Sequence, residues 1–356
     1  FTKSAAEVLE AWFESEPAKA VFGFDSIVGN FASPWTPGSA YVLLHHVFGE
    51  VNGNKGVWGH AIGGMGAITQ AMAKEAQARG VEISTDVEVN RVLVRDGRAC
   101  GVMLANGDEI SADRVVSNVN PKLLYLKLIE AQELDADVLA RMRQWRCGSG
   151  TFRMNVALSV LPDFSCLPGK TAALHHSSGI IIAQSLKYME RAYFDARERG
   201  FSREPIVEML IPSTVDDTLA PKGMHVASLF CQHFDPQPAD KSWDELREQA
   251  ADTIIDTVNR YAPNFKASIV GRLALSPLDL ERRFGLIGGD IFHGALGLDQ
   301  LFSARPMLGH ADYRGPLKGL YMCGAGTHPG GGVTGAPGHN AAREILRDRG
   351  WLRRFG

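Results

Sequence analysis

The spacing of apolar positions changes along the chain, and each spacing predicts a different element. A period of three to four residues after Gly66 predicts an amphipathic helix that ends at Gly80. A second such helix starts at Ser242, where Ser242 and Glu245 form a capping-box pattern, and Pro263 ends it. The apolar face of the first helix consists of Ile68, Ala71, Met72 and Ala76. Further helices are predicted at 40–48, 133–145, 279–284 and 186–199, the last of which is capped by Gly200.

Alternating or continuous apolar runs predict strands between these helices. Asp96-Gly97 is a hairpin signal between an alternating run at 85–94 and a return strand at 99–104. Other predicted strands are 81–83, 109–116, 151–160, 205–212 and 225–230. Helices and strands are therefore mixed throughout the chain.

The stretch from Leu320 to Leu346 has the most unusual composition. Leu320–Cys323 is a short apolar run typical of a buried parallel strand, and 335–348 is predicted to be a helix. Seven of the fifteen residues from Gly324 to Gly338 are glycine. A glycine loop between a strand and a helix directs backbone N–H groups and the positive end of the helix dipole at a ligand. A purely structural glycine-rich turn is the alternative interpretation.

Two familiar nucleotide motifs are absent from this loop. No Gly-Lys-Ser/Thr ends it, and the third glycine of the dinucleotide pattern G-x-G-x-x-G is misplaced. The loop sequence instead resembles the C-terminal flavin-contacting segment of the phytoene-desaturase-like FAD oxidoreductases. Segments 63–68, 279–289 and 298–306 resemble one branch of that superfamily, the group of pyridine nucleotide-disulphide oxidoreductase domain-containing protein 2. The similarity extends from about Phe22 to Leu346.

Length and composition fit this resemblance. The chain has 356 residues, 45% hydrophobic residues and a net charge of −3, which suggests two domains and argues against a nucleic-acid partner. Its five cysteines are scattered without C-x-x-C, which predicts a reducing compartment, no metal site and no redox disulfide. The sequence contains no run of eighteen apolar residues that would predict a transmembrane segment, and no secretory signal is visible.

The resemblance implies a fold class of α/β plus α+β: an incomplete FAD-binding Rossmann-type domain with an inserted mixed α+β substrate domain. Family members begin with a βαβ unit that carries pyrophosphate-binding glycines, and this sequence, which starts without Met, has none. We therefore expect the C-terminal part of a longer chain. The predicted boundaries are 1–60 and 119–305 for the substrate domain, and 61–118 and 306–356 for the FAD domain.

The resemblance also implies FAD as cofactor and hydride transfer between flavin and an apolar small molecule. The implied cofactor contacts are Val87, Gly324, Ala325, Gly326, Gly331, Gly332, Val333 and Thr334. No catalytic residue is assigned; His328 is a candidate acid or base, and bracing of the loop is its alternative role. Expected partners are the substrate and a second copy or the missing N-terminal half. The compartment would be cytoplasmic in a bacterium and mitochondrial in a eukaryote.

Two other interpretations remain open from sequence. The chain could be a non-catalytic interaction or regulatory module that kept a flavoprotein fold. It could also be a separate subunit whose βαβ half comes from another polypeptide. Flavin content and co-purifying chains distinguish these alternatives from the enzyme.

Overall fold

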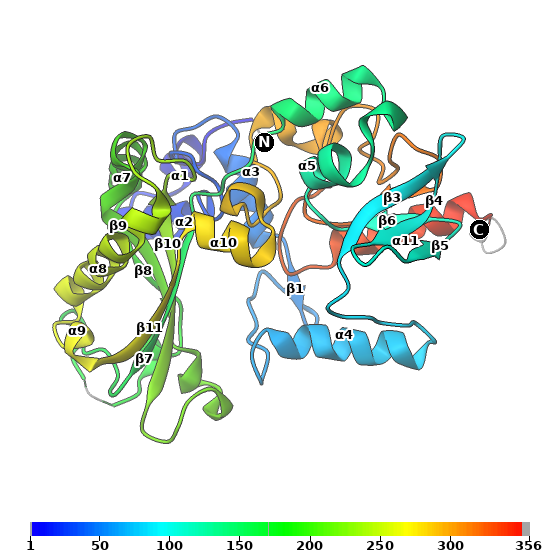
Figure 1. Cartoon of the computed structure of the whole chain (residues 1–356). Helices are drawn as coiled ribbons and strands as arrows, with labels where there is room; N and C mark the ends of the chain where they lie inside the picture. The colour runs from blue at the N-terminus through cyan, green and yellow to red at the C-terminus, as the bar shows by residue number, and fades with distance from the viewer. Residues whose placement is uncertain (1, 170, 351–356) are drawn as a thin grey trace. The chain divides into compact units, whose positions relative to one another are not determined.

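The computed structural model describes residues 2–169 and 171–350 (Figure 1). The chain divides into two compact units, each built from two separate segments. Unit 1 contains residues 1–83 and 148–289, and unit 2 contains residues 84–147 and 290–356. The predicted domains also include residues 1, 170 and 351–356, which lie outside the described residues.

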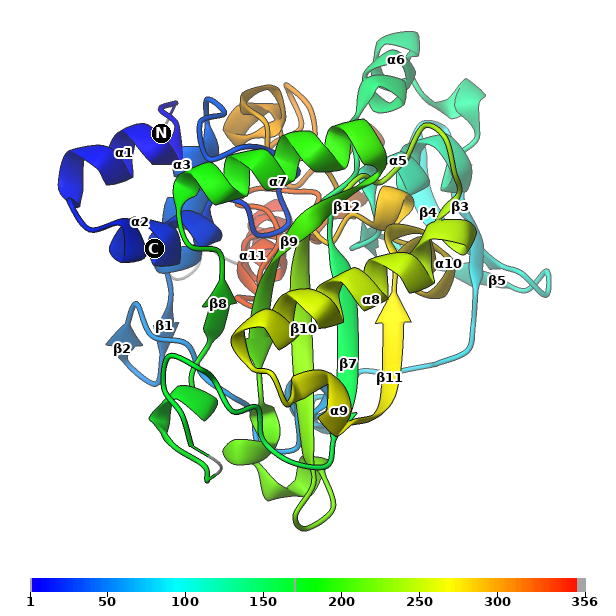
Figure 2. The ribbon, with the colours of Figure 1, turned by 90° about the vertical axis from the view of Figure 1, so that its left-hand side faces the viewer.

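An antiparallel five-stranded sheet forms the centre of unit 1, in the order β11-β7-β10-β9-β8. Its strands are β7 (Phe152–Leu158), β8 (Ile180–Ile182), β9 (Phe201–Leu210), β10 (His225–Phe234) and β11 (Ile269–Leu275). Figure 2 shows them with the long helix α8 (Trp243–Tyr261) across one face. The predicted strands at 151–160, 205–212 and 225–230 correspond to β7, β9 and β10.

The alternation of side chains decides which sheet face is buried against α8. Met154, Val207 and Leu229 belong to one apolar cluster that also contains Leu246 and Ile254 of α8. Their neighbours in sequence point to the opposite face, because successive strand residues alternate. The capping box predicted at Ser242 and Glu245 starts α8, as expected.

Several further helices pack within unit 1. They are α1 (Ala5–Trp12), α2 (Glu16–Asp25), α3 (Ser39–Val47), α7 (Leu186–Arg199), α9 (Phe265–Ser268) and α10 (Pro277–Phe284). Ser4 and Glu7 form a capping box at α1, and Gly200 ends α7 as predicted. Pro277 occupies the first turn of α10, where its missing N–H costs nothing.

The segment from Glu50 to Ile83 is almost entirely exposed. It contains the short hairpin β1 (Glu50–Val51) and β2 (Asn54–Lys55), followed by α4 (Gly66–Ala78). The helix forms where predicted, but the prediction of a packed apolar face is wrong, because no α4 residue is buried. The Gly63 amide, just before α4, donates a 2.7 Å hydrogen bond to Asp216.

The strand prediction for 81–83 and the first part of 85–94 is also wrong. Residues 81–88 form no strand, and regular pairing begins only at Val89. Alternation makes a segment compatible with a sheet, but a strand forms only where a neighbour accepts its hydrogen bonds. No strand of the described chain supplies that neighbour for 81–88.

Unit 2 has one antiparallel and one parallel sheet. The first consists of β3 (Val89–Arg95), β4 (Arg98–Leu104) and β5 (Glu109–Ser111), with the predicted turn at Asp96-Gly97. The second pairs β6 (Val115–Ser117) with β12 (Leu320–Met322) in parallel, as expected of the run before the glycine loop. The unit also contains the helices α5 (Pro121–Leu123), α6 (Ala136–Gln144) and α11 (Ala336–Asp348).

The compact units divide the chain at other positions than the predicted domain boundaries. Residues 61–83, expected in the FAD domain, group with unit 1, where the Gly63–Asp216 hydrogen bond attaches them. Residues 119–147 and 290–305, expected in the substrate domain, group with unit 2. The reason is visible in the core of unit 2, where Leu124 and Met142 pack with Leu320 and Met322 of β12.

The assignment of sheet faces predicts that substitutions at two adjacent residues of β7 change the free energy of unfolding by very different amounts. Met154→Ala should lower the free energy of unfolding by about 2–5 kcal/mol, because it leaves a cavity against α8. Asn155→Ala, which alters an exposed residue on the other face, should stay within about 0.5 kcal/mol. Denaturant unfolding measures both, and equal effects would contradict the face assignment.

Candidate cofactor site

The glycine loop begins where the parallel strands β6 and β12 end. The Cys323 amide donates to the Ser117 carbonyl at 2.9 Å, which extends the pairing to the start of the loop. A Cβ at Gly324 would clash with the backbone of Asn118, and one at Gly326 would clash with the ring of Pro121. A Cβ at Gly331 would clash with the Phe292 ring. These three glycines are explained by close packing inside unit 2, so the structural interpretation holds for this part of the loop.

The second half of the loop has a different environment. Residues 332–335 are exposed, and the Val333 side chain is 72% accessible. A Cβ at Gly335 or Gly338 would meet no atom within 4 Å. These glycines are not required by neighbouring protein atoms, although Gly335 needs its positive φ of 67° to start the helix.

Helix α11 begins directly after this exposed segment. Its N-cap is Gly335, which has no side chain to bind the first amides, although Thr334 Oγ1 accepts from the Ala336 amide at 3.2 Å. The first turn of a helix presents N–H groups and a partial positive charge. An exposed backbone followed by such a helix start fits the ring and carbonyl groups of a flavin.

Buried Arg305 fixes the first half of the loop from within unit 2. Its guanidinium is fully buried and donates to the Ala325 carbonyl at 2.8 Å and to the Phe292 carbonyl at 2.7 Å. It also reaches the carbonyls of Gln300, Gly294 and Ala295, at 3.1, 3.3 and 3.4 Å. Its central carbon lies 5.4 Å from the centre of the Trp145 ring. One side chain thus holds the loop against segments 292–295 and 300.

In the sequence, Arg305 stands out only as part of segment 298–306, which resembles the corresponding segment of the related oxidoreductases. Its environment was not predictable, because the five carbonyl groups come from positions up to 20 residues away. Fully buried arginine is unusual, and an arginine in an Ala-Arg-Pro context carries no local signal of burial.

Tyr313 and Arg314 orient helix α11 relative to the loop. The Tyr313 hydroxyl donates to the His328 carbonyl at 2.9 Å and accepts from the Asn340 amide at 2.8 Å. Arg314 binds both oxygens of Asp348, at 2.8 and 2.9 Å, and Glu344 at 2.7 Å. These hydrogen bonds raise the pKa of Arg314 and lower the pKa of Asp348, so both side chains stay charged at neutral pH.

The predicted site residues fall into two groups. The loop brings the residues from Gly324 to Thr334 together, whereas Val87 lies apart in sequence, in the exposed strandless segment before β3. Its adenine contact stays a prediction. The His328 ring is half-buried, with its centre 6.0 Å from that of Phe302, and its carbonyl braces Tyr313. These contacts favour the loop-bracing role for His328.

The cysteines of this unit show no sign of activation. Burial raises the pKa of Cys147 to about 11, and burial also raises the pKa of Cys323 beside the loop. A raised pKa disfavours the thiolate, which is the reactive form. Across residues 2–169 and 171–350, no group of three His, Cys, Asp or Glu side chains is arranged to hold a metal ion. No helix in those same ranges is long and apolar enough to cross a membrane.

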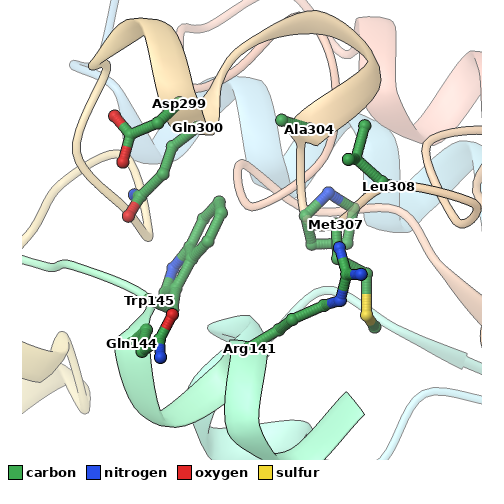
Figure 3. Close-up of a pocket in the computed structure, with 9 residues that line it drawn as sticks. Arg141, Gln144, Trp145, Asp299, Gln300, Ala304, Met307 and Leu308 are labelled. Atoms are coloured by element: carbon green, nitrogen blue, oxygen red, sulfur yellow. The ribbon is translucent and has the colours of Figure 1, made fainter. Parts of the chain in front are cut away.

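A separate pocket of about 250 Å³ lies beside α6 in unit 2 (Figure 3). Its wall contains Trp145, Arg141 and Asp299. Arg141 binds Asp137 at 2.7 Å and Asp299 binds Arg146 at 2.6 Å, so these charged groups already have partners. None of the predicted cofactor contacts lines this pocket.

Comparison with known proteins finds similarity to flavin-dependent oxidoreductases. The sequence model of a family described as flavin containing amine oxidoreductase matches residues 3–151. A rat protein, "Pyridine nucleotide-disulfide oxidoreductase domain-containing protein 2", is 44% identical over 354 residues, which is 98% of this chain and 61% of the relative. A lycopene-forming phytoene desaturase from Pseudescherichia vulneris is 26% identical over 346 residues, covering 94% of this chain and 63% of that protein.

The chain is thus similar, over nearly its whole length, to FAD oxidoreductases of the amine-oxidase-like and phytoene-desaturase-like type. One component of the limonene dehydrogenase of Castellaniella defragrans is another relative, 25% identical over 303 residues, covering 81% of this chain and 55% of that protein. Among solved structures, an oxidoreductase from Methanosarcina mazei superimposes with a TM-score of 0.58 at 15% identity, covering 97% of this chain and 68% of the other. A variant of putrescine oxidase gives a TM-score of 0.59 at 16% identity, covering 97% and 68%.

These structural likenesses show the fold, a mixed α/β architecture shared with flavin-dependent amine oxidoreductases. The chain spans about three fifths of the length of the curated relatives it matches. What those whole proteins do therefore applies to this chain only as a proposal.

The role of Arg305 can be tested without any cofactor. Arg305→Met should destabilise the chain by about 3–5 kcal/mol, because it leaves several buried carbonyls without donors. Hydrogen exchange of amides 324–330 should accelerate. Arg343→Met, which alters an exposed arginine of α11, is the matched control and should change stability by less than about 0.5 kcal/mol. Unchanged exchange in the loop of Arg305→Met would contradict the assigned role.

Proposed function

We propose that this chain is the flavin-facing and substrate-binding portion of an FAD-dependent oxidoreductase of the desaturase or dehydrogenase type. The observation that carries the proposal is the exposed segment 332–335 followed by the start of α11, where a Cβ at Gly335 or Gly338 would meet no atom within 4 Å. The similarity to flavin-dependent relatives supports flavin as the ligand of this surface. Unit 2 then belongs to an incomplete Rossmann-type FAD domain, and unit 1 is its inserted substrate domain.

Bound flavin would supply the hydride chemistry. The chain contributes position and charge. The backbone of 332–335 offers amides at a surface free of side chains except Val333 and Thr334. The start of α11 would present its positive dipole end to a bound flavin, and a positive dipole end near the negative charge that develops on reduction would favour the reduced form. Arg305 and Tyr313 keep this surface in place through the loop carbonyls.

The substrate we infer has a large apolar part. Two relatives carry the names of apolar compounds, phytoene and limonene. The open sheet face of unit 1 includes exposed Leu210 and Leu273, which suit such a molecule. The hydride step itself often requires no base from the chain, which is consistent with the bracing contacts of His328.

Gly338 provides a clean test of the flavin contact. Gly338→Leu should leave the stability of the flavin-free protein unchanged or slightly higher, because its side chain enters open space in a helix that glycine weakens by about 0.5–1 kcal/mol. In the longest natural form of the protein, the same substitution should lower FAD affinity at least about tenfold by occupying the cofactor surface. Equilibrium dialysis with FAD measures this.

Two comparisons make the Gly338 test specific. Gly331→Leu should unfold unit 2 because it overlaps Phe292, so flavin loss there reports folding only. Gly332→Val is less informative, because the φ of 133° at Gly332 strains any side chain. A folded Gly338→Leu protein with normal FAD affinity would contradict the proposed contact.

The expected absence of a pyrophosphate-binding βαβ unit gives a further prediction. Residues 1–356 alone should bind FAD at least about tenfold more weakly than the longest natural form, because phosphate contacts supply charge-assisted hydrogen bonds. Fluorescence quenching of FAD measures both affinities. Tight stoichiometric binding by residues 1–356 would refute this division of the site.

A further inference from the structure

The sheet face of unit 1 that does not pack against α8 has an ordered pattern of polar and apolar residues. One row across the sheet places Arg153 of β7, Phe230 of β10 and Glu208 of β9 side by side. The next row places Leu273 of β11, Asn155, Ser228 and Leu210 in register. Leu210 and Leu273 are 44% and 45% exposed, so this second row is the open, partly apolar end of the face.

The ionisable groups near the first row form no ion pairs. The Arg153 guanidinium donates to Ser228 at 2.8 Å and lies 5.0 Å from the centre of the Phe230 ring. In the described part of the chain it has no carboxylate within 4 Å. Among the described residues, no ion pair and no hydrogen bond is made by the side-chain carboxyl group of Glu208 or by that of Asp25, at the end of α2.

Burial acts on all three groups. It lowers the pKa of Arg153 and raises the pKa of Glu208, and the attraction between these two opposite charges, which stand more than 4 Å apart, acts against both shifts. Burial, together with the neighbouring Glu208, raises the pKa of Asp25 to about 7. Desolvated ionisable groups without ion-pair partners are costly to folding and concentrate at sites that bind ligands.

Two uncharged side chains at the closed end of the same face add an independent observation. Thr151 and Gln232 lie one residue beyond the paired Phe152 and Cys231, and both are fully buried. The Thr151 hydroxyl and both polar atoms of the Gln232 amide have no hydrogen-bond partner. Buried polar groups are almost always satisfied, so three unsatisfied atoms beside three unpaired ionisable groups indicate a site for a polar ligand.

We propose that this face binds an amphiphilic amino-carboxylate, with its carboxylate on Arg153, its ammonium group between Glu208 and Asp25, and its apolar chain along Leu210 and Leu273. The planar guanidinium matches a carboxylate, and an ammonium group has three donors for the two acidic side chains. Phe230 separates the two polar contacts. That this ligand is the enzyme's substrate rests on the proposed function; the binding site itself does not.

Four probes with the same chain and different polar ends test the proposal by isothermal titration. α-Aminooctanoate carries both charges, octanoate only the anion, octylamine only the cation, and octanol neither. The full protein should bind α-aminooctanoate at least about tenfold more tightly than octanoate or octylamine, and octanol most weakly, because each charge-assisted contact is worth about a factor of ten. Equal affinity for all four, or no binding by any of them, would overturn the proposal.

Single substitutions assign the two ends. Arg153→Met should reduce α-aminooctanoate affinity to that of octylamine, and Arg153→Lys should restore part of it. Glu208→Gln should reduce the affinity to that of octanoate. Arg272→Met is the matched control: Arg272 lies in the same sheet but faces α8 and binds Glu248 at 2.8 Å, so probe affinities should not change. An Arg153→Met protein with wild-type preference would refute the assignment.

Flavin content separates this proposal from the proposed function. Every variant above should retain wild-type FAD, because none of the changed residues belongs to unit 2. Probe selectivity in a protein that binds no FAD would refute the oxidoreductase while leaving the binding site intact. Normal FAD without probe selectivity would refute the binding site alone.

Discussion

The candidate cofactor site depends on one buried positive charge. Arg305 brings together backbone carbonyls from residues 292–295, 300 and 325, which lie between 5 and 20 residues away from it in the sequence. Carbonyl dipoles converge on the guanidinium, and the loop is fixed at Ala325 as a result. Because the loop is held at its beginning, its later residues can be exposed and still have a defined position. Tyr313 and Arg314 then set the direction of α11.

The glycines of the loop serve two different purposes. Gly324, Gly326 and Gly331 allow the chain to pack against Asn118, Pro121 and Phe292. A Cβ at Gly335 or Gly338 would meet no protein atom within 4 Å, so both positions border open space at the start of α11. The density of glycine therefore reflects both internal packing and an external ligand, whereas the sequence suggested a single cause. The cofactor interpretation now rests on residues 332–338 rather than on the whole loop.

Local signals predicted local structure well. Capping at Ser242 and Gly200, the turn at Asp96-Gly97 and the apolar run before the loop all identified real elements, since each depends on neighbouring residues. The strand prediction fails at residues 81–88 because pairing requires a distant partner. The environments of Arg305 and Arg153 could not be predicted from the sequence either, because burial of a charge is a property of the assembled fold. Resemblance identified the family, yet the chemistry of the unit 1 sheet face became visible only in three dimensions.

Each unit has a surface that we propose to bind a ligand. In unit 2 this is a backbone surface at a helix start, and in unit 1 it is a face with unpaired charges beside exposed leucines. The most direct test is the visible absorption spectrum of the wild-type protein purified from its native source. The account predicts flavin absorption bands at about one equivalent per chain, which bleach on addition of a reductant. An intact, folded protein without these bands, to which added FAD does not bind, would contradict it.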